Sequence, residues 1–336
     1  MRHILIGGHG FLGRELVRQI LARPGDSAVV VDLAQAYDIQ KKLDDPRVSY
    51  VAADVSVPGS LDVIEVTPED VFHHLASRLI IPNRPRFERD AYFRVCAIDG
   101  TREILRCMKA ADTTSLIFWS TDMVYGPALT IPRPEDHPRH PFGPYGRSKV
   151  AAEDLLEPLR LSGELSCTIF RPRLILGPGR LGILEVLFKL IDKGWPVPLI
   201  GPGDNRFQFV SVADCARASL MAADAGCPSA TFNLGSADSP TVHELMTEFI
   251  ARSGSQSRLL RTPGRLIKGL LRGLNLVKIS PLDPEQFEIA DLEVSLDITA
   301  AEKELGWVPT ESDTALLCAA YDSYKASQGN AVKNAI

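Results

Sequence analysis

Long hydrophobic runs are absent from this 336-residue chain. No apolar stretch approaches the roughly 20 residues that a transmembrane helix needs. The N-terminus enters an apolar strand after a single arginine, and Gly7 interrupts that strand, so we expect no signal peptide. Repeats and low-complexity tracts are also missing. The sequence gives no firm membrane signal, and we expect a cytoplasmic protein.

Metal-binding spacings are absent too. The six cysteines include no C-x-x-C pair, and the adjacent His73 and His74 have no suitably spaced carboxylate or thiol. We therefore expect free thiols, packing histidines and no metal site. The net charge is −5, so the chain has no excess of positive charge to bind nucleic acid. The 45% hydrophobic and 24% charged residues are typical of a globular enzyme.

The first motif that is present is a glycine-rich turn. An apolar run at residues 3–6 ends in Gly7-Gly8-His9-Gly10-Phe11-Leu12-Gly13, and helical periodicity follows. This order of strand, turn and helix is typical of dinucleotide binding. Gly7 permits the tight turn, Gly10 the approach of a pyrophosphate, and Gly13 close packing of helix on strand. The free N–H groups at the helix start, around Phe11 and Leu12, are then expected to bind the phosphates.

Further candidate cofactor residues follow the next predicted strands. Asp32 ends the second strand 19 positions after Gly13, where a carboxylate that binds the adenosine ribose is expected. A 2′-phosphate would meet like charge there, which favours NAD over NADP. A solvated aspartate at a strand end is the alternative. The third strand ends in Asp54-Val55, close to the expected adenine, and the fourth leads into Leu75-Ala76-Ser77, where small residues let the cofactor pass.

A Tyr-x-x-x-Lys pair, Tyr145 and Lys149, lies at the start of a predicted helix that runs to about Leu161. Residues four apart share one face of a helix, so the ammonium can lower the pKa of the phenol. The phenol then becomes an acid or base near neutral pH. Thr121, after a preceding strand, can hydrogen-bond the same substrate oxygen. Asp122 is a candidate for proton transfer or for holding a hydroxyl.

The alternation of strands and helices predicts an α/β fold. We expect a Rossmann-type doubly wound parallel sheet and a smaller mixed α/β C-terminal substrate domain. Residues 1–170 are predicted to form the NAD-binding domain, to which residues 205–235 return. Residues 171–204 and 236–326 are predicted to form the substrate-binding domain, and residues 327–336 a flexible tail.

Taken in order, these motifs resemble the extended short-chain dehydrogenase/reductase family, in its NAD-dependent epimerase/dehydratase group. The resemblance covers nearly the whole chain and is carried by Gly7–Gly13, Asp32, Asp54-Val55, His74-Leu75-Ala76, Gly100-Thr101, Ser120–Gly126, Tyr145–Lys149, Phe170-Arg171-Pro172, Phe209–Asp214, Phe232–Gly235 and Glu304–Pro309. It implies NAD as cofactor, with Pro172 among its contacts. It also implies that Tyr145 is the acid/base, that Lys149 holds the nicotinamide ribose and that Thr121 polarises the substrate oxygen. Family members often form homodimers, here through residues 86–110 and the helix that carries Tyr145.

Departures from the family pattern concern the substrate. Met123 stands where the dehydratase branch has a glutamate base, which disfavours 4,6-dehydration. Phe207 stands where an arginine usually reaches the diphosphate of a nucleotide sugar, and Arg206 is one position away. Residues 284–289 lack the second expected arginine, and Ala97 and Leu174 replace frequent asparagines.

Residues 258–278 interleave six cations with leucines and isoleucine. The segment is open to three interpretations: an amphipathic helix with a solvated basic face, a face for substrate phosphate, or a membrane-surface helix. Three glycines weaken it as an autonomous helix.

We therefore expect an NAD-dependent epimerase or oxidoreductase that acts on a secondary alcohol of a sugar, with a nucleotide sugar as the leading substrate class. An alcohol dehydrogenase or ketoreductase for a steroid- or lipid-like substrate is the alternative. A non-catalytic NAD-binding scaffold or sensor is the third hypothesis.

Overall fold

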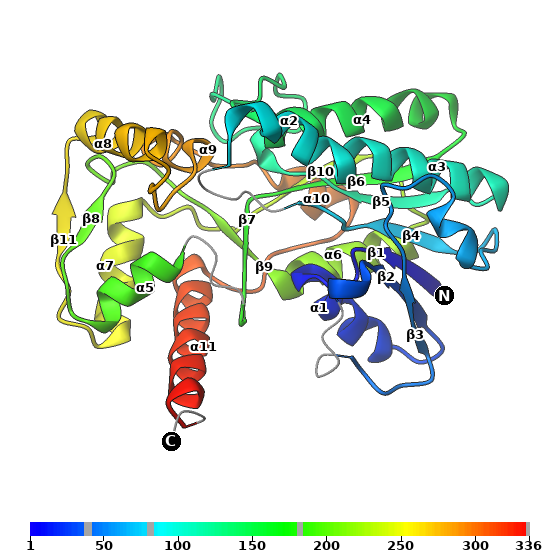
Figure 1. Ribbon diagram of the computed structural model, residues 1–336, viewed down its shortest axis with the longest axis horizontal. Coiled ribbons are helices and arrows are strands. Elements are labelled where there is room, and N and C mark those ends of the chain that lie inside the picture. The colour runs from blue at the N-terminus through cyan, green and yellow to red at the C-terminus, as the bar shows by residue number, and fades with distance from the viewer. Residues whose placement is uncertain (37–41, 79–83, 180–183, 334–336) are drawn as a thin grey trace.

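A parallel sheet forms the centre of the computed structural model, which describes residues 1–36, 42–78, 84–179 and 184–333. Its strand order is β3-β2-β1-β4-β5-β6-β10, and all neighbours in it are parallel (Figure 1). The strands are β1 (Arg2–Ile6), β2 (Ser27–Asp32), β3 (Val48–Ala52), β4 (Val71–His74), β5 (Ser115–Trp119), β6 (Ser166–Pro172) and β10 (Thr231–Leu234). The order reverses between β1 and β4, so a ligand crevice is expected at their carboxyl ends. The α/β prediction is confirmed.

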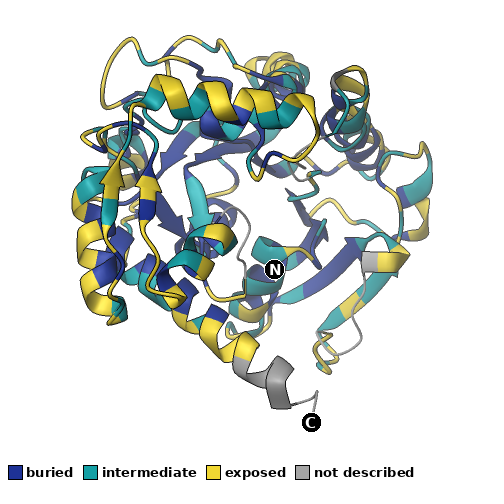
Figure 2. Cartoon of the chain, turned by 60° about the vertical axis from the view of Figure 1, so that its left-hand side comes forward, coloured by how far each residue is buried: buried dark blue, intermediate teal, exposed yellow. Residues whose placement is uncertain are grey.

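Helices cover both faces of this sheet, as its apolar strands require. On one face, α1 (Phe11–Leu21) and α6 (Val212–Asp224) lie side by side. On the other lie α2 (Arg86–Arg94), α3 (Gly100–Ala110) and α4 (Pro144–Ser162) (Figure 1). A π-helical turn, Val95–Asp99, joins α2 to α3. Most of the strands are accordingly buried, as Figure 2 shows in dark blue, whereas the edge strand β3 has no buried residue.

A second hydrophobic core lies outside the sheet, around Phe188, Phe249 and Tyr321. It is built from α5 (Leu184–Asp192), β8 (Val197–Leu199), α7 (Val242–Ser253) and α11 (Asp313–Lys333), together with the small pairs β7 (Leu174–Leu176) with β9 (Phe209–Ser211) and β8 with β11 (Leu259–Arg261). The chain enters this second core after β6, returns to the sheet through α6 and β10, and enters the core again at α7. Two short helices follow, α9 (Pro284–Phe287) and α10 (Thr299–Glu304).

Two details differ from the sequence-based expectation. The basic segment 258–278 is not one helix, because β11 occupies its start and α8 (Gly264–Leu276) begins after Pro263. The residues expected to form a flexible tail are helical as far as Lys333, because α11 continues beyond Ser327. Residues 334–336 lie outside the described ranges. None of the helices in those ranges is long and apolar enough to cross a bilayer.

Candidate active site

The glycine turn after β1 has no room for side chains. Gly7 adopts a positive φ of 81°, and a Cβ atom there would lie 2.6 Å from the backbone of Ala76. A Cβ atom on Gly13 would lie 2.3 Å from the Gly8 carbonyl oxygen. The turn therefore packs directly against the loop after β4, at the point where the sheet order reverses. The roles predicted for Gly7 and Gly13, a tight turn and close helix packing, fit this geometry.

The N-terminus of α1 faces this crevice without a side-chain cap. Gly10 is the N-cap residue and offers no hydrogen-bonding side chain to the first turn of the helix, which begins with Phe11 and Leu12. Asp32, at the end of β2, lies against the same turn, and its carboxylate accepts hydrogen bonds from the backbone N–H groups of His9 and Leu33. A pyrophosphate suits the helix end and a ribose diol suits the carboxylate, so these residues fit NAD.

The remaining predicted cofactor residues lie along the same edge of the sheet. Leu75 and Ala76 are half-buried after β4, and Ser77 is exposed beside them. After β3, Asp54 is exposed and accepts two hydrogen bonds from Ser56, whereas Val55 is buried against α3. Pro172 is the buried last residue of β6. The Asp54 carboxylate is thus accessible to a ligand, whereas the Val55 side chain packs against α3.

Lys149 is buried beneath the end of β5. Its ammonium donates a hydrogen bond of 2.7 Å to the Trp119 carbonyl oxygen, and only 2% of the residue is exposed. Burial lowers the pKa of Lys149 to about 8, partly offset by Cys96 and Glu153. The ammonium is therefore bound to the residue two positions before Thr121, and Lys149 lies one helical turn after Tyr145. It supplies a positive charge at the base of the expected nicotinamide site.

Thr121 caps a short 3-10 turn, Asp122–Val124, in which its hydroxyl oxygen accepts a hydrogen bond from the Met123 N–H at 3.2 Å. Asp122 is buried beside it and accepts a hydrogen bond of 2.9 Å from the Arg173 guanidinium. Both members of this ion pair are almost wholly buried. Asp122 is therefore engaged with Arg173 rather than presented as a free acid, which favours a positioning role over proton transfer.

Tyr145 lies in the first turn of α4, with its ring edge-on to Phe93 at 5.5 Å between centroids. Its backbone N–H donates to Glu285 Oε1 at 3.3 Å. The structure thus places Thr121, two residues after β5, and Tyr145 and Lys149, in the first turns of α4, near the carboxyl end of the same strand.

The chain has relatives among known proteins. Residues 3–235 match the NAD dependent epimerase/dehydratase family. The chain belongs to this family. It is accordingly an NAD-dependent enzyme of the oxidoreductase or isomerase type.

Individual relatives of this epimerase/dehydratase family member are distant. An uncharacterised protein of Sinorhizobium fredii, y4nG, is 28% identical over 97% of this chain and 79% of its own. A UDP-glucose 4-epimerase of Mycolicibacterium smegmatis is 25% identical over 92% and 94%. The crystal structure of DesIV, a dTDP-glucose 4,6-dehydratase from Streptomyces venezuelae with NAD and TYD bound, aligns with a TM-score of 0.76 at 24% identity, over 98% of both chains. This last likeness establishes the fold.

Two residues near the site were not identified from the sequence. Arg173 occupies a position that strand patterning alone marks as ordinary, because its importance depends on reaching Asp122 from another strand. Glu285 lies in α9, where Asp283 and Gln286 form a capping box that a sequence can reveal. The capping box predicts the short helix but not its contact with Tyr145, 140 positions earlier.

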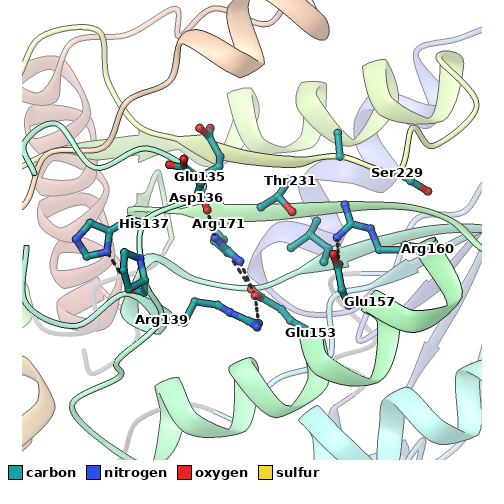
Figure 3. Close-up of a pocket in the computed structure, with 13 residues that line it drawn as sticks. Glu135, Asp136, His137, Arg139, Glu153, Glu157, Arg160, Arg171, Ser229 and Thr231 are labelled. Carbon is teal, nitrogen blue, oxygen red and sulfur yellow. Dashed lines mark hydrogen bonds and ion pairs between the residues drawn. The ribbon is translucent and has the colours of Figure 1, made fainter. Parts of the chain in front are cut away.

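A cavity of about 420 Å³ lies away from these residues (Figure 3). It is bordered by the loop around Asp136, by α4, by β6 and by the edge strand β10. Its charged side chains are paired with one another: Arg171 and Arg139 both bind Glu153, and Arg160 binds Glu157. Because Glu153 also accepts a hydrogen bond from Ser120, this network buttresses the strand end that carries Thr121. We assign it a supporting role and not the chemistry.

Proposed function

We propose that this enzyme oxidises, and in an epimerisation re-reduces, a secondary alcohol of a sugar that is linked to a nucleotide. The observation that carries the proposal is the buried Lys149 ammonium, one helical turn after Tyr145, which is fixed on the carbonyl of Trp119, two residues before Thr121. Bound NAD supplies the hydride acceptor. A buried cation at this place has no structural ion-pair partner among the described residues, so it is available to a phenolate and a ribose.

The residues of the chain then divide the proton chemistry. Tyr145, as the phenolate stabilised by Lys149, removes the hydroxyl proton of the substrate. The Thr121 hydroxyl, held by its contact with the Met123 N–H, donates to the oxygen that becomes a carbonyl. In epimerisation the keto sugar turns over within the pocket and Tyr145 returns the proton. Arg173 keeps Asp122 in place beneath this group.

The named relatives support the nucleotide-sugar class. One is a UDP-glucose 4-epimerase and another a dTDP-glucose 4,6-dehydratase. Dehydration is not proposed for this chain, because the Met123 side chain cannot act as the base that removes a carbon-bound proton. Epimerisation or simple oxidoreduction remains.

A specific observation favours a non-nucleotide alcohol as the second candidate. The Arg206 guanidinium is exposed and hydrogen-bonds the Ser239 carbonyl, and Phe207 lies beneath the guanidinium of Arg173. Residues 284–289 place the carboxylates of Glu285 and Glu288 where a diphosphate-binding arginine was expected. A hydrophobic alcohol or ketone requires none of the missing cations.

Thermal unfolding with saturating NAD, with and without UDP, dTDP, GDP or CDP, separates these candidates. A ligand that binds only the native state adds about 2.7 kcal/mol at a hundredfold excess over Kd. A shift with one nucleotide supports the nucleotide-sugar class and identifies its base. A shift with NAD alone contradicts that class and directs turnover assays to non-nucleotide alcohols. Tyr145→Phe should bind NAD but lose turnover; unchanged turnover would refute the assignment, and absence of turnover in wild type would leave the scaffold hypothesis.

The proposal includes a homodimer in the cytoplasm. Its interface would use the outer surface of α2, α3 and α4, where Phe87 is 85% exposed. The six cysteines are free in the structure, which a reducing compartment would maintain.

A further inference from the structure

The α8 helix carries an exposed apolar ridge. Leu266 is 70% exposed, Leu270 59%, Leu276 77% and Val277 64%, and Ile279 just beyond the helix is 66% exposed. Positions 266, 270, 273 and 277 follow one line along a helix, and Leu276 lies beside that line. A helix that only solvates a basic face would turn its leucines inward. This one turns Leu266, Leu270 and Leu276 outward while Arg265 and Arg272 are exposed as well, so a solvated basic face alone does not account for its surface.

The opposite side of α8 is already occupied. Leu271 is buried, Lys268 binds Asp291 and the Glu288 carbonyl, and Arg272 binds the Glu288 carboxylate. These contacts fix the helix on α9 in the orientation that leaves the ridge uncovered. In Figure 1, α8 lies at the outer margin of the molecule, far from the end of α11. The ridge is therefore a surface that the described residues do not cover.

The charged residues of the segment that carries the ridge are all positive. From residue 258 to 279 the chain has six lysines and arginines and no aspartate or glutamate, although the whole chain has a net charge of −5. Arg265 and Lys278, which flank the ridge at its two ends, are exposed and make no ion pair with the described residues. Arg261 reaches only a distant carboxylate, Asp204 at 3.8 Å. The surface is thus apolar in its centre and cationic at its ends.

We propose that α8 is an interfacial helix that holds this enzyme on an anionic lipid bilayer. The leucine ridge would enter the boundary between headgroups and acyl chains while Arg265 and Lys278 contact acidic headgroups. A second copy of the chain is a poor occupant, because a two-fold interface at this face would place the same cations against each other. The helix is too short to span the bilayer. The binding is therefore peripheral.

Flotation of the full-length protein with vesicles tests the proposal. We expect the wild type to bind vesicles of phosphatidylcholine with about 30% phosphatidylglycerol, to bind phosphatidylcholine alone about tenfold less, and to be released at roughly 0.5 M salt. The triple variant Leu266→Gln, Leu270→Gln, Leu276→Gln and the charge variant Arg265→Glu, Lys278→Glu should each lose about tenfold or more of the binding. Leu161→Gln, at an 80% exposed leucine on α4, should bind as the wild type does.

Retention of the NAD-induced thermal shift shows that each variant is folded. Absence of wild-type binding to the acidic vesicles overturns the proposal, as does undiminished binding by the leucine variant. A third result would also overturn it: the wild type self-associates with rising concentration but does not bind vesicles, and only the leucine variant loses this self-association. That result would identify a second copy as the occupant. None of these readouts depends on the substrate, so failure here is distinct from failure of the proposed function.

Discussion

The backbone N–H of Tyr145 donates a hydrogen bond to the Glu285 carboxylate, which ties the first turn of α4 to α9. Glu285 is buried, and its second oxygen has no partner among the described residues. A Cβ atom on Gly143 would collide with this side chain. The candidate acid/base is thus positioned by a residue from the C-terminal part of the chain.

The first prediction concerns the pH dependence of stability. Burial raises the pKa of Glu285 to about 7, so the native state holds a proton that the unfolded chain releases near pH 4.5. The contribution of Glu285 to stability is therefore greatest below pH 4.5 and falls as the pH rises to 7, by up to about 3 kcal/mol. Glu285→Gln should abolish this part of the slope in urea unfolding from pH 4.5 to 8. Glu288→Gln serves as the control, and identical slopes for wild type and Glu285→Gln would contradict the prediction.

A second prediction separates stability from function at Lys149. Its pKa of about 8 lies below the ordinary 10.5, so the unfolded state binds more protons between these values and stability rises with pH across that window. Lys149→Met should lack this rise and gain about 1–2 kcal/mol at pH 7, less than the full shift because the Trp119 carbonyl loses its donor.

The same variant should lose NAD affinity and turnover. Urea unfolding at pH 7 and pH 10 and NAD titration provide the measurements. Lys189→Met, at an exposed lysine on α5, should change stability by less than about 0.5 kcal/mol. A Lys149→Met protein that is less stable at pH 7 and still turns over would show that the lysine is structural.

The third prediction concerns the buried pair of Asp122 and Arg173. Arg173→Met leaves the carboxylate without its partner in the interior and should cost about 3–5 kcal/mol of unfolding free energy. Adding Asp122→Asn should recover a substantial part, because the uncompensated charge is removed. A double-mutant cycle in urea unfolding measures the coupling; Arg206→Met, at an exposed arginine, is the control. Additive effects of the two substitutions would argue against the pairing.

Two helical glycines provide a matched comparison. Gly13→Ala places a methyl group 2.3 Å from the Gly8 carbonyl oxygen, so the turn must move. We expect a loss of about 1–3 kcal/mol of stability and a weaker affinity for NAD. Gly269→Ala in α8 meets no atom within 4 Å and should stabilise by about 1 kcal/mol. Calorimetric titration measures the NAD affinity of each variant, and thermal unfolding measures its stability. Equal changes in the two variants would contradict the close packing at Gly13.

The last prediction tests the proposed dimer. Phe87→Glu adds a charge at the exposed aromatic residue on α2 and should convert a dimer into monomers in sedimentation experiments. Trp195→Glu, at a 55% exposed tryptophan in the other half of the molecule, should leave the oligomeric state unchanged. A Phe87→Glu protein that sediments as the wild type does would place the interface elsewhere or exclude it.

Local patterns predicted the N-terminal half well. The glycine turn, the strand that ends in Asp32 and the four-residue spacing of Tyr145 and Lys149 each combine a short-range pattern with a fixed geometry of strand or helix. The C-terminal end of α11 was harder to predict from the sequence, because the limits of this helix depend on packing against α7, which is distant in the sequence. The basic segment divided into strand and helix because β11 pairs with β8, 62 positions earlier at Leu259 and Val197.

The sequence by itself determined the family of folds and the cofactor class and indicated the candidate residues for the chemistry, because each follows from spacing within a few turns of backbone. Only the tertiary structure decided their electrical surroundings. Asp122 pairs with Arg173, and Glu285 contacts Tyr145, although the members of each pair are distant along the chain. The burial that lowers the pKa of Lys149 likewise depends on segments that the chain brings together only when it folds. The tertiary structure also decided which face of α8 is covered, since helical periodicity divides a helix into faces but does not say which one meets a neighbour.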